Sequence, residues 1–519
     1  MPPRHCLKKE IYMRQLPKWL SDAVFYEIYP QSFQDTNGDG IGDIPGMIQR
    51  LDYIKSLGCN AIWVNPWYDS PFGDAGYDVR DYKKIAPRYG TNDDAKNFFD
   101  AAHARGMHVL IDLVPGHTSI EHPWFRASMR PERNEYSDRY IWTNSIWEST
   151  DLACIRGISQ RDGSAAVNFF SNQPALNYGY ANRTRPWMMS PDSPAALATR
   201  EAIKDVMRFW LDLGADGFRV DMAASLVKAD EGWTETIKLW QDFRAFLDAE
   251  YPHCAMVSEW GVPAKSIEGG FHMDFMLHFG PPAYNSLFRC EHPFFSREGK
   301  GDITVFLDTY LADLASTQGR GLICIPSSNH DMPRLARGRD VRDLKICFTF
   351  LLTMSGAPFL YYGDEIGMRY LEGVTSVEGG YDRTGSRSPM QWEKRTGFGF
   401  TTGDTPYIPF DRSADAPTVA EQETREDSLL NAVRALLRLR HVHKALQSFG
   451  EFVPVYAEAG KYPFAYERRA DGEHILVILN PADREEPISF DCSGEVLFQV
   501  GGVPADGKVP ARSACVILR

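Results

Sequence analysis

Short hydrophobic runs alternate with amphipathic stretches over the first part of the chain. The predicted strands cover 23–30, 59–66 and 107–114, and the predicted helices between them cover 46–58 and 94–106. Gly58 and Gly106 follow the last apolar positions of the two helices, where glycine commonly ends a helix. Strands that alternate with helices predict a parallel α/β architecture, as a closed barrel or a doubly wound sheet.

The alternation of strand-like and helical stretches stops after 114 and resumes near 199. Residues 115–186 are rich in Arg, Asn, Ser, Trp and Tyr and have no clear period. Because a long irregular segment inside a compact unit usually serves function, we predict an inserted subdomain that shapes the pocket. A helical pattern follows at 199–214, and further strand-like runs lie at 217–221, 255–259, 272–277, 322–327 and 358–365. The chain therefore has about eight strands of this kind.

The last part of the chain has a different pattern. After a helical stretch at 428–446, short alternating runs separated by turns predict a small antiparallel β domain. We therefore predict an N-terminal extension, a parallel α/β unit in two segments, an inserted subdomain and a C-terminal β domain. Their bounds are 1–16 for the extension, 17–114 and 187–446 for the α/β unit, 115–186 for the subdomain and 447–519 for the β domain.

Three acidic residues follow hydrophobic runs. Asp221 ends GFRVD, Glu259 ends AMVSE, and Asp331 ends LICIPSSNHD. In a barrel of parallel strands the carboxyl ends converge on one face, where active sites lie. Placing three carboxylates close together there costs free energy, so we expect such an arrangement only where a reaction requires it. Cleavage of a glycosidic bond needs a nucleophile and a proton donor, and it gains from a third group that positions the sugar.

The neighbours of these acids suggest their roles. Arg219 and Asp221 are two apart on a strand and so share one face, where the guanidinium would lower the pKa of the carboxyl and keep it nucleophilic. The alternative is a structural Arg–Asp pair. Glu259 precedes Trp260, and desolvation against an indole would raise its pKa, as a proton donor requires. The alternative there is an acid at a helix N-terminus.

Composition narrows the class of protein. The 519 residues carry a net charge of −13 with no basic stripe, which argues against a nucleic-acid or anionic-membrane partner. Nine cysteines form no CxxC pair, the start of the chain lacks the apolar stretch of a signal peptide, and no later run has membrane-spanning length. We expect a cytoplasmic enzyme, as a monomer or small homo-oligomer.

Five segments, taken in order, resemble a known family. GYDVRDY, DLVPGHTS, GFRVDMAAS, VSEW and SSNHD are similar to the signature regions of the α-amylase family, glycoside hydrolase family 13, over residues 18–445. The resemblance implies a TIM (β/α)8 barrel, a subdomain inserted after the third strand, a C-terminal β-sandwich and a retaining mechanism. It implies that Asp221 attacks the anomeric carbon, that Glu259 protonates the leaving oxygen and then activates water, and that Asp331 grips sugar hydroxyls. The residues implied to line the glucose subsite are Tyr77, Asp112, His117, Arg219 and His330.

Two segments resemble the oligo-1,6-glucosidase and α-glucosidase branch of that family. The first is SRSPMQWE at 386–393, and the second is DTNGDGIGD at 35–43, which resembles the branch's metal loop. In addition, Asp74 resembles the acid that closes the pocket around a non-reducing-end glucose. The oxygen ligands of the loop at 35–43 for a structural Ca²⁺ or Mg²⁺ would be the side chains of Asp35, Asn37, Asp39 and Asp43 and the carbonyl of Ile41. The alternative is a Gly/Asp turn without metal.

Some positions depart from the family. Gly116 stands where the family usually has an asparagine, Ala175 where the branch typically has an aspartate, and Met222 matches neither the α-1,6-acting nor the α-1,4-acting relatives. The resemblance therefore leaves the linkage open between α-1,4, α-1,6, α-1,1 and sucrose-type bonds. The leading interpretation is a glycosidase that cleaves short α-glucosides from the non-reducing end. Its alternatives are a transglycosylase or isomerase of the trehalose synthase or sucrose-converting type, an α-amylase acting on longer glucans, and a non-catalytic relative.

Overall fold

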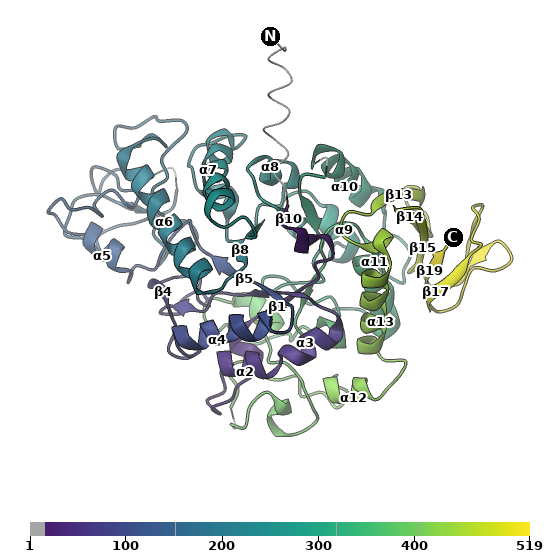
Figure 1. The fold of residues 1–519 in the computed structure, drawn as a ribbon. Helices are drawn as coiled ribbons and strands as arrows, with labels where there is room; N and C mark the ends of the chain where they lie inside the picture. The colour runs from purple at the N-terminus through teal and green to yellow at the C-terminus, as the bar shows by residue number, and fades with distance from the viewer. Residues whose placement is uncertain (1–15, 151, 318, 404) are drawn as a thin grey trace, which may run out of the picture.

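Eight parallel strands form the largest sheet of the protein, whose computed structural model describes residues 16–519 apart from 151, 318 and 404 (Figure 1). They are β1 (Phe25–Ile28), β2 (Ala61–Val64), β5 (His108–Leu113), β8 (Gly217–Val220), β9 (Ala255–Ser258), β10 (Met273–Phe275), β11 (Leu322–Cys324) and β12 (Phe359–Tyr361). β1 pairs with both β2 and β12, and Pro326 just after β11 bridges Phe359 in β12. The sheet thus closes into a nearly complete barrel, which confirms the predicted (β/α)8 fold. The predicted extension lies outside the described residues except for residue 16.

Helices surround this barrel (Figure 1). They are α2 (Ile44–Gln49), α3 (Leu51–Leu57), α4 (Asn92–His103), α6 (Pro194–Leu213), α7 (Thr234–Glu250), α8 (Pro263–Glu268), α9 (Ala283–Phe288), α10 (Thr304–Thr317), α11 (Val341–Thr353), α12 (Val419–Glu423) and α13 (Leu429–Val442). The single helix predicted at 46–58 is wrong, because Arg50 leaves the helical conformation at φ −102° and ψ 3°. Its side chain bonds the Gln34 amide oxygen at 2.7 Å and lies over the Trp392 ring at 4.0 Å.

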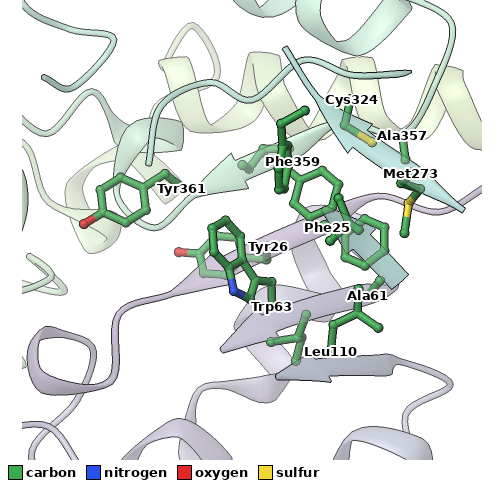
Figure 2. Close-up of a cluster of buried hydrophobic side chains, with 14 of the residues drawn as sticks. Phe25, Tyr26, Ala61, Trp63, Leu110, Met273, Cys324, Ala357, Phe359 and Tyr361 are labelled. Carbon is green, nitrogen blue, oxygen red and sulfur yellow. The ribbon is translucent and has the colours of Figure 1, made fainter. Parts of the chain in front are cut away.

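Aromatic side chains fill the barrel interior (Figure 2). Phe25 and Phe359 stack with ring centroids 4.1 Å apart, and Phe275 meets Phe359 edge-on at 4.7 Å. Trp63 lies 5.6 Å from Phe275, and all four side chains are buried. The barrel is therefore a packed core rather than a pore, and polar side chains meet at its carboxyl end.

The segment between β5 and α6 forms the irregular unit expected at 115–186. It contains the short helix α5 (Pro123–Ser128) and a two-stranded pair, β6 (Cys154–Ile155) with β7 (Ala165–Ala166). Tyr180, Trp187 and Met188 belong to a small apolar cluster of its own. Ala175 is fully buried there and bridges to His117, so the later part of the unit pairs with its first residues after β5.

The C-terminal part is an antiparallel sheet, as predicted. Its order is β13 (Glu451–Tyr456), β14 (Phe464–Ala470), β15 (Glu473–Asn480), β19 (Ser513–Leu518) and β17 (Glu495–Val500), beside the small pair β16 (Glu486–Pro487) and β18 (Lys508–Val509). Leu476, Ile478 and Ile517 pack with Val509 on the face toward the small pair. On the barrel side, α11 and α13 contact the sheet, and Arg468 donates to the Thr353 carbonyl at the end of α11. No helix among the described residues combines the length and apolarity needed to cross a membrane.

Candidate active site

The three predicted acids line one cavity of about 600 Å³ at the carboxyl end of the barrel. Asp221 follows β8, Glu259 follows β9, and Asp331 lies beyond β11. Three more of the predicted residues also line it, namely Asp74, Tyr77 and His117. The remaining three, Asp112, Arg219 and His330, are buried behind the wall, with at most 1% of each residue exposed, and contact the lining residues from there.

Arg219 holds the acids together. Its Nη2 lies 2.7 Å from Glu259 Oε1, and its Nη1 lies 3.2 Å from Asp221 Oδ1. The same Nη1 donates to Asp112 Oδ1 at 2.7 Å. One buried guanidinium thus faces three carboxylates, so it cannot neutralise all of them, and the group carries excess negative charge.

Burial and the excess negative charge affect the pKa of Asp221, which lies beside Glu259. Burial and the negative charge of Glu259 raise the pKa of Asp221 well above its usual range, against the opposing charge of Arg219. The expectation that Arg219 would keep this pKa low is wrong, because burial and the charge of Glu259 outweigh the guanidinium. Burial and the neighbouring charge therefore disfavour the state in which both carboxyls are ionised. A retaining mechanism starts from a state with one carboxylate and one carboxylic acid.

The loop after β8 and strand β10 hold Glu259 and its neighbours in place. The backbone N–H of Met222, which has a φ of +44°, donates to Glu259 Oε2 at 2.9 Å. Asp274 accepts the N–H of Trp260 at 3.2 Å and the hydroxyl of Ser258 at 2.7 Å, and burial raises its pKa to about 8. Asp274 was missed in the sequence, although an acid in the apolar run HMDFML was a signal for it.

His330 connects the barrel interior to Asp331. Its Nδ1 lies 2.8 Å from Glu27 Oε1, and its Nε2 lies 3.0 Å from Asp331 Oδ2 and 2.7 Å from Tyr77 Oη. Burial lowers the pKa of His330, but Asp331 and Glu27 overcome it and raise the pKa to about 9. Burial acts to raise the pKa of Asp331, yet the charges of His330 and Arg383 hold it well below its usual range. At neutral pH these groups are an imidazolium and a carboxylate.

We expect Glu27→Gln to make activity sensitive to alkali. The change removes one of the two anions that keep His330 protonated, so the imidazolium is lost at lower pH. The raised pKa of His330 contributes to the free energy of unfolding below the unfolded value of about 6.5, and this contribution is lost as pH rises toward about 9. The wild type therefore loses it between about pH 6.5 and 9, and the variant loses it at lower pH. kcat/KM should fall at least about threefold relative to wild type at pH 9 and stay within about twofold at pH 6. Parallel pH profiles would contradict a link between Glu27 and the His330 charge.

An arginine closes the other end of the cavity. Arg383 Nη1 donates to Asp331 Oδ1 at 2.7 Å, and its Nη2 lies 3.5 Å from Asp74 Oδ1. Gln173 donates to the other Asp74 oxygen at 2.7 Å, and Arg387 Nη2 lies 3.0 Å from Asp331 Oδ1. Burial raises the pKa of Asp74 to about 6. Gln173 and Arg383 were missed in the sequence, because both are common residues in segments without a period.

A buried lysine joins the irregular unit to the barrel. Lys228 Nζ donates to Asn168 Oδ1 at 2.8 Å and to the Ser225 carbonyl, and burial lowers its pKa to about 8. Asn168 Nδ2 in turn lies 3.2 Å from His117 Nδ1. A Cβ at Gly116 would lie 2.7 Å from Asn168 Nδ2, so the glycine provides the space for this amide. Burial lowers the pKa of His117 to about 3, which leaves a neutral ring at the cavity wall.

The loop predicted to bind a metal closes on its own hydrogen bonds. Asp35 accepts the N–H of Asn37 at 3.0 Å, Asn37 accepts that of Asp39 at 2.9 Å, and Asp39 accepts that of Ile41 at 2.9 Å. Asp43 caps α2 by accepting the N–H of residue 46 at 2.7 Å. Within the described ranges no group of three His, Cys, Asp or Glu side chains has the arrangement of a cation site. The Ca²⁺ or Mg²⁺ stays a prediction, which these hydrogen bonds do not test.

Known proteins match the chain over most of its length. Residues 27–448 match the sequence model of the family described as "Alpha amylase, catalytic domain". The chain is 32% identical to the trehalose synthase/amylase TreS of Mycobacterium tuberculosis (strain CDC 1551 / Oshkosh), over 92% of this chain and 84% of that protein. It is 31% identical to the oligo-1,6-glucosidase of Parageobacillus thermoglucosidasius, over 90% and 91% of the two chains. Among solved structures, an isomaltulose synthase variant from Erwinia rhapontici NX5 in complex with D-glucose superposes with a TM-score of 0.81 at 27% identity, over 97% of this chain and 99% of that one.

Proposed function

Because the chain belongs to the α-amylase family of glycoside hydrolases, we propose that it is a retaining enzyme that acts on short α-glucosides from their non-reducing ends. The observation that carries this proposal is the shared guanidinium of Arg219, which holds Asp221 and Glu259 at one cavity. Action on chain ends is supported by Arg383, which lies between Asp74 and Asp331 in the wall of the cavity and so takes up space there.

The first step transfers the glucosyl group to the enzyme. The Asp221 carboxylate attacks the anomeric carbon and forms an ester bond as the glycosidic C–O bond breaks, and the proton on Glu259 passes to the leaving oxygen. The ionised Asp331 binds sugar hydroxyls and favours the positive charge that develops on the ring. The guanidinium of Arg219 stabilises the negative charge that remains on Glu259 once the proton has left.

The second step decides between hydrolysis and transfer. Glu259, now a carboxylate, removes a proton from the incoming hydroxyl, whose oxygen attacks the anomeric carbon and releases Asp221. Water as the acceptor gives glucose, the activity proposed first. A sugar as the acceptor gives a new disaccharide, and the trehalose synthase and isomaltulose synthase among the similar proteins support this as the second candidate.

Product analysis over time distinguishes the two. The panel is maltose, isomaltose, maltotriose, sucrose, trehalose and soluble starch, with Asp221→Asn as the inactive control. Early release of glucose from one disaccharide, with starch barely attacked, would establish an α-glucosidase and its linkage. New disaccharides without matching glucose would establish a transferase or isomerase. A wild type as inert as the variant on the whole panel would overturn the proposal.

We propose that the loop at 35–43 binds Ca²⁺ or Mg²⁺ through oxygen donors, with a structural role. A ligand that binds the folded state alone stabilises it by about 2.7 kcal/mol at one hundred times its Kd. We therefore expect removal of metal with EDTA to lower Tm by a few degrees and added Ca²⁺ or Mg²⁺ to restore it, with about one ion per chain by elemental analysis. Asp39→Asn should remove the response. Equal Tm values with EDTA and with either ion would sink the metal site.

A further inference from the structure

A second cavity of about 470 Å³ lies beside the active site. His278 lines both cavities, and Met332, which follows Asp331, lines the second. Five arginines surround this second cavity, Arg289, Arg297, Arg334, Arg337 and Arg339, and Asp343 is the one carboxylate among its described lining residues. The proposed glycosidase chemistry makes no use of this charge.

Two of these arginines have no anionic partner among the described residues. Arg289 donates to the Pro333 carbonyl at 2.8 Å and to Tyr284 Oη at 2.8 Å. Arg339 donates to the Phe288 carbonyl at 2.8 Å, with its other bonds also to carbonyls. These bonds brace the walls of the cavity and fix both guanidinium groups, but carbonyls neutralise no charge. The cavity therefore keeps a positive charge held in place by the fold.

Arg334 lies behind the wall of the second cavity. Its side chain is fully buried, with Nη1 at 2.7 Å from the Tyr362 carbonyl and 3.2 Å from Asp364 Oδ1. Its Nε and Nη2 have no hydrogen-bond partner in the described part of the chain, and the guanidinium lies over the Tyr361 and Tyr362 rings at 4.7 and 4.8 Å. Because the Arg334 side chain is 0% exposed, it supports the cavity wall from behind and makes no direct contact with a ligand in the cavity.

The cavity mouth carries arginines that a ligand can reach. Arg337 pairs with Glu372 at 2.8 Å, and its side chain is 55% exposed. Arg297 pairs with Asp343 at 2.6 Å and is 46% exposed. The Arg337–Glu372 pair is exposed on both sides and therefore weak, so Arg337 can exchange its carboxylate for a dianion, whereas Arg297 also lies 3.2 Å from Asp340 and stays at the mouth as a fixed positive charge.

We infer that this cavity binds a small molecule bearing a phosphate group. Arginine forks match the tetrahedral oxygens of phosphate, and a dianion would balance the charges of Arg289 and Arg339. A volume of about 470 Å³ admits a phosphorylated sugar but no polymer. Since His278 is a wall of both cavities, a phosphosugar bound here lies next to the catalytic acids, as a glucosyl acceptor or its competitor. That acceptor role rests on the proposed function, whereas phosphate binding does not.

Calorimetric titration of the full chain with inorganic phosphate and with glucose 6-phosphate, at constant ionic strength, tests the site. We expect saturable binding of phosphate that excess glucose does not displace. Tighter binding of glucose 6-phosphate would identify a phosphosugar as the ligand, and equal binding would identify free phosphate. Because the readout is binding, an enzyme inert on every glucoside leaves this test intact.

Substitutions at the mouth provide the second arm. Arg297→Gln with Arg337→Gln should weaken phosphate binding at least about tenfold, because two charge-assisted contacts are lost. Ser296→Glu, which adds a carboxylate to the lining, should abolish it even if the double variant folds poorly. Arg412→Gln is the matched control, an exposed arginine that lines neither cavity, and should bind as wild type does. Absence of saturable binding, or equal binding by wild type and Ser296→Glu, would overturn the inference.

Discussion

Asp221→Asn is expected to lower kcat/KM for every α-glucoside by at least about 10⁴-fold while Tm stays constant or rises. An amide cannot form the ester with the anomeric carbon, and loss of a nucleophile removes most of the rate enhancement of a covalent mechanism. Yet the same change removes a charge that the fold tolerates badly, because Asp221 lies buried beside Glu259. Loss of activity with a gain in stability is typical of residues kept for chemistry.

The pH dependence of stability sharpens this prediction. A pKa raised on folding means that the Asp221 contribution is favourable below the unfolded value of about 3.9 and is lost as pH rises toward the folded value. The variant has no such loss. The difference in free energy of unfolding between variant and wild type should therefore grow in favour of the variant as pH rises from about 4. Denaturant unfolding at pH 4, 5, 6 and 7 measures it.

A control separates chemistry from architecture. Asp192→Asn changes an exposed aspartate and should alter neither kcat/KM nor Tm. If Asp221 were merely the structural partner of Arg219, Asp221→Asn would lower Tm at neutral pH. A variant that is destabilised but still active would rule out Asp221 as the nucleophile.

The strands of the barrel and the acids at their ends could be predicted from the sequence, because the patterns that indicate them are local. A buried parallel strand is a short apolar run, and an acid at its end is placed by the topology alone, as Asp221 and Glu259 are. The break in the first predicted helix was not readable. It accompanies contacts of Arg50 with Gln34 and Trp392, which lie 16 and 342 residues away, and no local pattern encodes them.

The surroundings of the acids were less predictable than the acids themselves. From the sequence Arg219 is the partner of Asp221, two positions away, and the structure adds Asp112 and Glu259 to the same guanidinium. Burial, together with the charge of Glu259, raises the pKa of Asp221 against the charge of Arg219. The partners of Asp331 come likewise from distant segments, with Arg383 52 residues away in a stretch without periodicity. Pairwise spacing predicts a contact, but charge balance depends on every group that the fold brings together.

Glu259→Gln should divide the reaction into its two steps. The amide cannot protonate a leaving sugar, so kcat/KM for maltose-type substrates should fall by about 10²- to 10⁴-fold. α-Glucosyl fluoride needs no such proton, and its fluoride should still be displaced by Asp221 in a burst. The glucosyl-enzyme then accumulates, because no base activates the incoming water. Glu250→Gln, at an exposed glutamate paired with Arg208, is the matched control and should behave as wild type.

Sodium azide then tests the stereochemistry. Azide is a small nucleophile that needs no general base, so it should attack the trapped intermediate in Glu259→Gln and raise turnover of the fluoride at least about tenfold. Two displacements at one carbon restore the starting configuration, so the product should be α-glucosyl azide. Azide should have no such effect on Asp221→Asn, which forms no intermediate. A β-glucosyl azide would mean a single displacement. Asp221 would then have to act as a base toward water rather than as the nucleophile.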